Sequence, residues 1–141
     1  MKIAVVTDAW HPQVNGVVTT LTRTIRELED RGHELLVISP AGFRTVPLPS
    51  YPEIRIALWP GRRVAAALAA FHPDAVHIAT EATLGRAARA FCVKIGQPFT
   101  TSYHTQFPEY LRSRLPVPLG ISYAVLRGFH SAAARTMVAT Q

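Results

Sequence analysis

Apolar strand patterns alternate with amphipathic helical patterns along the chain, and this alternation restricts the fold more than any other feature. Apolar residues from Val17 to Leu28 recur at helical spacing, whereas the continuous apolar run 35–38 is typical of a strand covered on both sides. The predicted strands are residues 2–7, 33–39, 54–59, 74–80, 98–103 and 136–140. The predicted helices are residues 17–31, 62–71, 84–95, 107–114 and 120–134. The expected fold is therefore α/β, a Rossmann-like parallel sheet with helices on both faces.

Glycine and proline residues mark the ends of several of these elements. Gly32 and Gly96 each follow a predicted helix and are expected to form its C-cap. The stretch 41–52 holds several prolines and has little periodicity, so we expect an exposed loop there. With 141 residues, the chain is long enough for one domain with a substantial core.

Composition excludes some classes of protein. Cys92 is the only cysteine, so no internal disulfide can form, and its apolar surroundings favour a small core residue. No apolar run approaches the roughly 20 residues that a membrane-spanning helix needs. The chain enters a predicted strand directly after Met1, without a signal-peptide pattern, which leads us to expect a cytoplasmic location.

The net charge of +6 favours binding to an anionic partner. The 15 basic residues are scattered rather than clustered, so a solvated basic surface explains them as well. No strand interleaves aromatic with basic residues, as single-strand nucleic-acid binding would require. Among specific partners, a membrane surface or a phosphorylated small molecule therefore ranks above DNA, and we expect no nucleic-acid partner.

Polar clusters follow three of the predicted strands. They are residues 8–16, the pair Thr80 and Glu81, and residues 103–106. In an open α/β sheet, ligands bind outside the carboxyl ends of the strands, so these clusters are expected to converge on one crevice. The first cluster ends in Gly16 at the start of a helix, where backbone N–H groups and the helix dipole favour an anion. This loop has one glycine instead of the three of a dinucleotide fingerprint, which disfavours an NAD enzyme.

Four segments carry a resemblance to a known family: TDAWHPQVNGVVTTL, LEDRGHEL, HPDAVHIATEATLG and FTTSYHTQFPEYL. In this order they resemble the amino-terminal half of glycosyltransferase family 4 enzymes, which have the GT-B fold. Within that family the chain is similar to the mannosyltransferase-like and sulfoquinovosyltransferase-like lipid glycosyltransferases. The resemblance covers essentially the whole chain.

The resemblance implies an enzyme of two Rossmann-like domains that face each other across a cleft. Residues 1–141 would form the amino-terminal, acceptor-side domain, and the carboxy-terminal domain that holds most of the donor nucleotide would be absent. The implied reaction transfers a hexose from a nucleotide sugar to a glycolipid or saccharide with retention of configuration and without a metal or cofactor. GDP-mannose is favoured over UDP-sugars as the donor. We expect the isolated fragment to be inactive.

The resemblance also assigns roles to individual residues. It places the donor diphosphate at Gly16, with Asn15 and Val17 beside it, where a side chain at Gly16 would hold the backbone away from the phosphate. An alternative is that Gly16 only permits tight packing of strand and helix. His104 matches the family histidine that faces the transferred sugar, as a hydrogen-bond donor or charge stabiliser rather than a nucleophile. A purely structural role is its alternative.

The remaining candidates line the acceptor side of the cleft: Asp8, Trp10, His11, Glu81, Tyr103 and Thr105. Asp8 and Glu81 offer carboxylates to acceptor hydroxyls. Alternatively, Asp8 satisfies nearby backbone N–H groups, and Glu81 lies near a helix start that favours negative charge. The other histidines, His33, His72, His77 and His130, are interpreted as structural or surface residues.

Residues 110–123 place Arg112 and Arg114 among apolar side chains, a composition that suits the inner membrane surface and a lipid acceptor. Ordinary packing on the domain explains the same composition. Two other functions remain open on sequence grounds: a stand-alone module that binds a phosphorylated ligand without turnover, and a basic nucleic-acid-associated domain.

Overall fold

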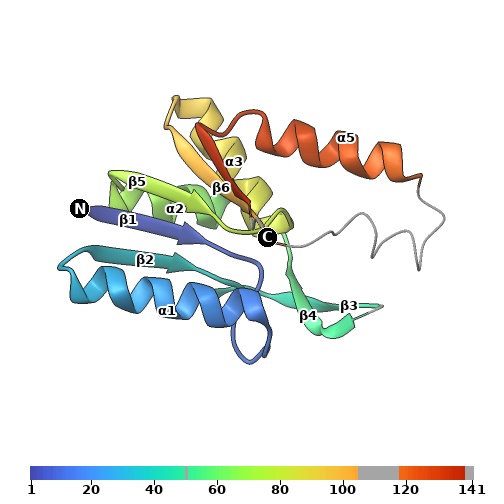
Figure 1. Ribbon diagram of the computed structural model, residues 1–141, viewed down its shortest axis with the longest axis horizontal. Coiled ribbons are helices and arrows are strands. Elements are labelled where there is room, and N and C mark those ends of the chain that lie inside the picture. The colour runs from blue at the N-terminus through green and yellow to red at the C-terminus, as the bar shows by residue number, and fades with distance from the viewer. Residues whose placement is uncertain (50, 105–117, 139–141) are drawn as a thin grey trace.

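A computed structural model describes residues 1–49, 51–104 and 118–138 of the chain. Its centre is a five-stranded sheet with the order β2-β1-β5-β6-β7, in which every neighbouring pair of strands is parallel (Figure 1). The strands are β1 (Lys2–Val6), β2 (Glu34–Ile38), β5 (Ala75–Ile78), β6 (Phe99–Tyr103) and β7 (Arg135–Val138). The α/β class and the parallel sheet predicted from the sequence are confirmed.

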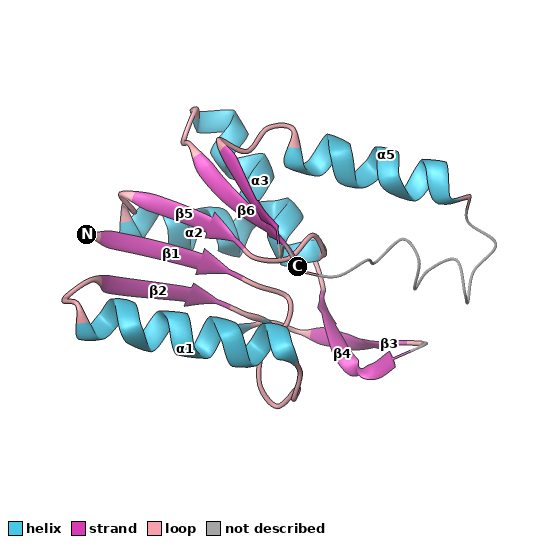
Figure 2. Cartoon of the chain, in the orientation of Figure 1, coloured by secondary structure: helices cyan, strands magenta, loops and turns pink. Residues whose placement is uncertain are grey.

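Helices cover both faces of this sheet, as expected (Figure 2). They are α1 (Gly16–Asp30), η1 (Pro40–Gly42, a single 3-10 turn), α2 (Gly61–Phe71), α3 (Thr83–Ile95) and α5 (Leu119–His130). The predicted helix 107–114 lies outside the described residues. Gly96 is the C-cap of α3, as predicted, with φ +70°. The C-cap of α1 is Arg31, and Gly32 follows it in the left-handed conformation with φ +84°.

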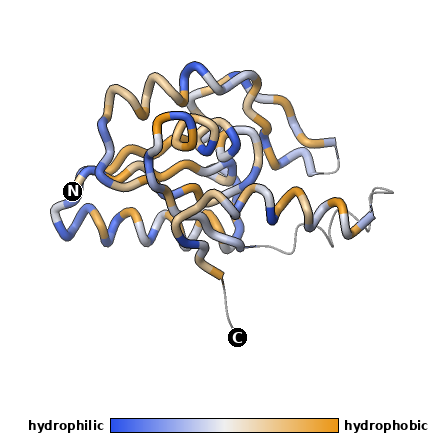
Figure 3. The backbone as a smooth tube through the Cα atoms, turned by 90° about the horizontal axis from the view of Figure 1, so that it is seen from above, coloured by the Kyte–Doolittle hydropathy of each residue, from blue (hydrophilic) through white to orange (hydrophobic). Residues whose placement is uncertain are grey.

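The two faces of β1 enter two different cores. Ala4 and Val6 pack with residues of α2, α3 and α5, whereas Ile3 and Val5 pack with residues of α1. This division follows from the two-residue period of a strand, and it explains why β1 reads as a continuous apolar run. Apolar residues run through the middle of the molecule in Figure 3. Cys92 is fully buried in the larger core, where burial raises the pKa of its thiol to about 11, so its predicted role as a core residue is confirmed.

The expectation of a loop over residues 41–52 is wrong. The chain there forms β3 (Thr45–Leu48), which pairs antiparallel with β4 (Tyr51–Ala57) in a separate two-stranded sheet. Proline is compatible with a strand whose N–H side has no partner, and each strand of a two-stranded sheet has such an edge. The Arg55 guanidinium reinforces the pair by donating to the hydroxyl of Thr45 at 2.9 Å and to its carbonyl at 3.0 Å.

None of the described helices is long and apolar enough to cross a lipid bilayer.

Candidate functional site

The carboxyl ends of the parallel strands meet at one edge of the sheet, together with the first turns of α1 and α3 (Figure 1). Asp8 follows β1, Glu81 follows β5 and His104 follows β6 at this edge. The predicted convergence of these clusters is confirmed for the first two by direct contact, because the Asp8 amide donates to the Thr80 hydroxyl at 2.6 Å. Thr105, Arg112 and Arg114 lie outside the residues that the structure describes.

Asp8 is buried, and its carboxylate caps the first turn of α3. One oxygen accepts from the backbone N–H of Leu84 at 2.8 Å, and the other accepts from the N–H of Gly85 at 3.3 Å and from the Thr80 hydroxyl at 2.7 Å. The N-cap residue of α3 is Ala82, which has no side-chain acceptor, so Asp8 supplies the cap from another element. Burial raises the pKa of Asp8, and these hydrogen bonds oppose the rise. Of the two roles left open for Asp8, the structure shows the pairing with backbone N–H groups.

Gly85 is a structural requirement that the sequence analysis missed. A Cβ at this position would lie 1.8 Å from the carbonyl oxygen of Thr80, so only glycine lets α3 approach the end of β5 this closely. The pattern offered a signal, because a glycine inside the first turn of a helix that follows a strand marks close helix–strand packing.

Gly16 opens α1 and is surrounded by space. A Cβ there would meet nothing within 4 Å, so the alternative of tight strand–helix packing for this glycine is wrong. The Asn15 side-chain oxygen caps the helix by accepting from the Val18 N–H at 3.0 Å, and its amide donates to the Gln13 side chain at 3.3 Å. Val17 packs its side chain against the smaller core. The N–H groups of Gly16 and Val17 precede the first intrahelical hydrogen bond and have no acceptor within the helix.

Trp10 and His11 fix the loop between β1 and α1. The Trp10 ring packs against the smaller core and lies edge-on to the His11 ring, with 5.3 Å between their centroids. His11 reaches α1, where its Nε2 lies 3.2 Å from the Thr22 hydroxyl. Both residues therefore hold the loop that leads to Gly16, whatever further role they have toward a ligand.

His104 is exposed at the end of β6, and the atoms around its ring displace enough water to lower the pKa of the imidazole. His77, on the neighbouring strand, lies between two hydroxyls of β6: its Nδ1 is 2.8 Å from Thr100 Oγ1 and its Nε2 is 2.9 Å from Ser102 Oγ. Burial, with a smaller contribution from His104, lowers the pKa of His77 to about 4. His77 is thus a neutral ring that fixes β6, which confirms its predicted structural role.

Glu81 contacts a residue that the sequence analysis did not connect with it. One of its carboxylate oxygens lies 3.2 Å from Nε2 of His130, the last residue of α5. Burial raises the pKa of Glu81 to about 7. The interpretation of His130 as a merely structural or surface residue missed this contact, since 49 residues separate the two side chains and no local pattern joins them.

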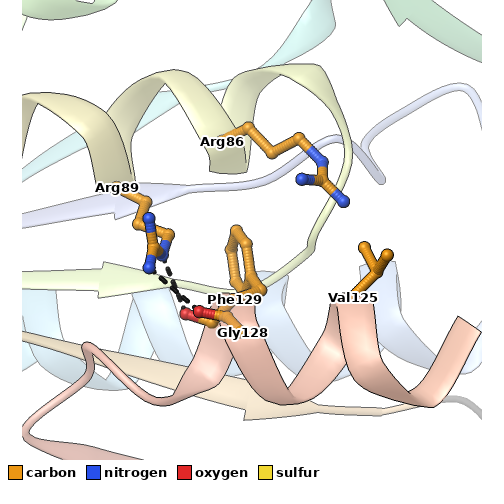
Figure 4. Close-up of a pocket in the computed structure, with 5 residues that line it drawn as sticks. All are labelled: Arg86, Arg89, Val125, Gly128 and Phe129. Atoms are coloured by element: carbon orange, nitrogen blue, oxygen red, sulfur yellow. Dashed lines mark hydrogen bonds between the residues drawn. The ribbon is translucent and has the colours of Figure 1, made fainter. Parts of the chain in front are cut away.

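A hollow of about 430 Å³ lies between α3 and α5 (Figure 4). Its lining residues are Arg86, Arg89, Val125, Gly128 and Phe129. The Arg89 guanidinium donates to the carbonyls of Phe129 and Gly128, both at 2.9 Å, so it binds the last turn of α5, where a cation is favoured. This contact fastens α5 to α3 and brings His130 to Glu81.

The fold is a Rossmann-like domain in which the start of α1 and titratable side chains at the ends of neighbouring strands lie at one edge of the sheet. The sequence profile described as Glycosyltransferase Family 4 matches residues 14–141. The chain therefore belongs to glycosyltransferase family 4, and the resemblance drawn from the four segments is confirmed.

Curated relatives agree with this family. A GDP-mannose-dependent alpha-mannosyltransferase of Mycobacterium tuberculosis is 30% identical over 97% of this chain and 41% of its own length. The enzyme of the same name from Mycolicibacterium smegmatis is 32% identical over the same shares. An alpha-monoglucosyldiacylglycerol synthase of Streptococcus pneumoniae is 27% identical over 92% of this chain and 33% of its own length. The chain thus spans about two fifths of the mycobacterial relatives.

Proposed function

We propose that the chain is the acceptor-side domain of a retaining hexosyltransferase that takes mannose from GDP-mannose and passes it to a glycolipid or saccharide. Family membership supports glycosyl transfer, and the names of the mycobacterial relatives, GDP-mannose-dependent alpha-mannosyltransferases, support GDP-mannose ahead of UDP-sugars. The name of the streptococcal relative, a glucosyldiacylglycerol synthase, supports a lipid acceptor. In this proposal the sugar nucleotide is a substrate, and neither a cofactor nor a metal takes part.

The observation that carries the proposal is the open start of α1. The N–H groups of Gly16 and Val17 have no intrahelical acceptor, and they lie at the positive end of a helix of 15 residues. Because Gly16 has no Cβ and open space before it, a diphosphate can approach the backbone directly. Asn15 supports the site indirectly, by capping α1 and keeping this turn in place.

His104 is the proposed catalytic residue. Its lowered pKa keeps the imidazole neutral at pH 7, so the ring can donate one hydrogen bond to a sugar hydroxyl or to the oxygen on which charge develops. It needs no role as a nucleophile in this arrangement. Trp10, His11 and Tyr103 are the proposed neighbours that shape the acceptor side.

The second wall of the cleft belongs to a carboxy-terminal domain in this proposal. Closing two domains over donor and acceptor would exclude water and align the acceptor oxygen with the anomeric carbon. The chain alone would then bind the donor weakly and transfer nothing.

The test uses the complete product of the reading frame that encodes this chain. It is incubated with labelled GDP-mannose, UDP-glucose or UDP-galactose and with a bacterial lipid extract, and labelled lipid is counted. We expect transfer from GDP-mannose, with the anomeric configuration retained in the product by NMR. Binding of GDP without transfer from any donor would contradict the proposal and favour a binding module.

Gly16→Val tests the anion position directly. We expect transfer to fall by about 100-fold, because the side chain holds the phosphate off the backbone, while the thermal midpoint stays within about 2 °C. Gly61→Val is the matched control, since Gly61 opens α2 and also has open space at its Cβ position. Equal activity of the two variants would remove Gly16 from the donor site.

A further inference from the structure

We propose that His130 is a positioning residue that holds the Glu81 carboxyl in place for a hydroxyl group of the acceptor. The inference rests on the proposed function and adds to it the last residue of α5. Its basis is a chain of contacts that runs from the edge of the sheet into the core.

The contacts behind His130 fix its ring. Its Nδ1 lies 2.8 Å from Thr101 Oγ1, and that hydroxyl lies 2.9 Å from Thr136 Oγ1 on β7. Two aromatic rings pack nearly perpendicular to the imidazole, with centroid distances of 6.0 Å to Tyr103 and 5.2 Å to Phe129. The ring is therefore oriented by β6, β7 and α5 together, and Nε2 is left to face Glu81.

The hydroxyl of Thr101 allows the His130 ring to form a hydrogen bond with Glu81 whether the Glu81 carboxyl is ionised or protonated. When Thr101 donates to Nδ1, Nε2 carries the proton and donates to an ionised Glu81. When Thr101 donates to Thr136 instead, Nδ1 carries the proton and Nε2 accepts from a protonated Glu81. The carboxyl thus keeps its partner and its position while its charge changes.

Glu81 remains reachable from solvent. Its side chain retains 22% of its exposure, against 14% for His130, and it follows β5 at the edge where β6 ends in Tyr103 and His104. Two nearby charged groups act on its ionisation besides burial: Arg86 of α3 favours its charged form, and Asp8 beyond β1 opposes it. His130 of α5 is its hydrogen-bond partner, and Tyr103 of β6 packs on the His130 ring.

These surroundings make acceptor binding dependent on pH. Burial is the main reason why Glu81 titrates near 7 rather than near 4.5. An ionised carboxylate accepts a hydrogen bond from a hydroxyl more strongly than a protonated one, so the KM for the acceptor should fall as pH rises from 6 to 8. The kcat should change much less, because neither residue touches the transferred sugar in this proposal.

The experiment compares His130→Phe, His130→Gln and Glu81→Gln in the complete gene product, with acceptor KM and kcat measured from pH 6 to 8.5. Phenylalanine keeps the ring packing and removes both nitrogens, so we expect acceptor KM to rise about 10-fold at pH 8, with kcat within 3-fold of wild type. Glutamine can donate to Glu81 and should return KM to within 3-fold. Glu81→Gln should abolish the pH dependence of KM.

A second measurement does not depend on turnover. NMR titration of the 141-residue chain should show the Glu81 carboxyl carbon and the His130 ring shifting with a common midpoint near 7, and Glu81→Gln should remove that midpoint from His130.

Separate midpoints, or an acceptor KM and pH profile that His130→Phe leaves unchanged, would overturn the inference while the proposed function stands. Absence of transfer by the wild type would overturn the proposed function and the acceptor role together. If His130→Phe does not fold, Thr101→Val tests the same chain of contacts with the same expected rise in KM.

Discussion

A single buried carboxylate, Asp8, holds the start of α3 from outside the helix. Asp8→Ala should lower the free energy of unfolding by about 2–3 kcal/mol, because the N–H groups of Leu84 and Gly85 would be left unpaired in a buried place. Asp8→Asn keeps one acceptor oxygen and should cost less. Urea unfolding followed by circular dichroism measures both. Asp30→Ala, at the exposed end of α1, is the control, and a loss no larger than that of the control would contradict the capping role.

His77 should make the fold sensitive to acid. Its pKa is about 4 in the folded chain and near 6.5 when unfolded, so the unfolded state binds the proton first and stability falls as pH drops from 6.5 to 4. The contribution is at most about 3 kcal/mol. Urea unfolding at pH 7 and pH 4.5 should show a smaller loss for His77→Gln than for wild type. His72→Asn, at an exposed position, should lose as much free energy of unfolding between pH 7 and pH 4.5 as wild type. An equally large loss for His77→Gln would contradict the role of His77 in acid sensitivity.

At the level of elements, we predict opposite effects on stability for alanine substitutions at two helical glycines. Gly85→Ala in α3 should destabilise the chain by about 3 kcal/mol, since the new Cβ would overlap the Thr80 carbonyl and force the helix away from β5. Gly128→Ala in α5 should be neutral or stabilise by up to about 1 kcal/mol, because its Cβ position is empty and alanine favours a helix. Thermal unfolding measures both. Similar midpoints for the two variants would show that α3 does not need the close approach.

Strand β3 shows where element prediction failed, whereas the predicted strand 54–59 overlaps β4. Prolines at 47, 49 and 52 dominate the local pattern and favour a loop. Three features stabilise a strand there in spite of the prolines. They are the pairing with β4, the hydrogen bonds from Arg55 to Thr45 and the burial of Ala57 in the larger core. Only the first of these has a local signature, since Thr45, Val46 and Tyr51 have high β propensity.

For the whole molecule, the order of elements along the chain was sufficient to predict the class of fold and the meeting of the first two polar clusters at one edge of the sheet. The cap that Asn15 forms at the start of α1 is a local pattern and could have been predicted, although the sequence analysis assigned Asn15 only to the diphosphate. The contact of His130 with Glu81 could not be predicted, and neither could the particular helix that Asp8 caps, because each contact joins residues that only the packed sheet brings together. Gly85 offered a partial signal as a glycine in the first turn of a helix, but its approach to Thr80 is seen only in the structure. Such contacts hold the candidate site together.

The net charge of +6 is a property of the whole molecule, and it predicts binding to anionic surfaces. If the enzyme takes its acceptor from a membrane, the chain should sediment with vesicles that contain anionic phospholipid at low ionic strength, but not with purely zwitterionic vesicles. Raising the salt to about 0.5 M should release it, because the Debye length then falls well below 10 Å.

Two double variants separate a docking segment from charge alone. Arg112→Ala with Arg114→Ala, and Arg23→Ala with Arg26→Ala, remove the same charge, the latter pair from the exposed face of α1. A local docking segment predicts that the first pair weakens vesicle binding several-fold more than the second. Leu111 and Leu115 flank Arg112 and Arg114 in the sequence, whereas Ile25, the apolar residue between Arg23 and Arg26, is buried in the smaller core. Equal losses would show that the basic surface acts as a whole, and the segment 110–123 would then have no special part in reaching the lipid.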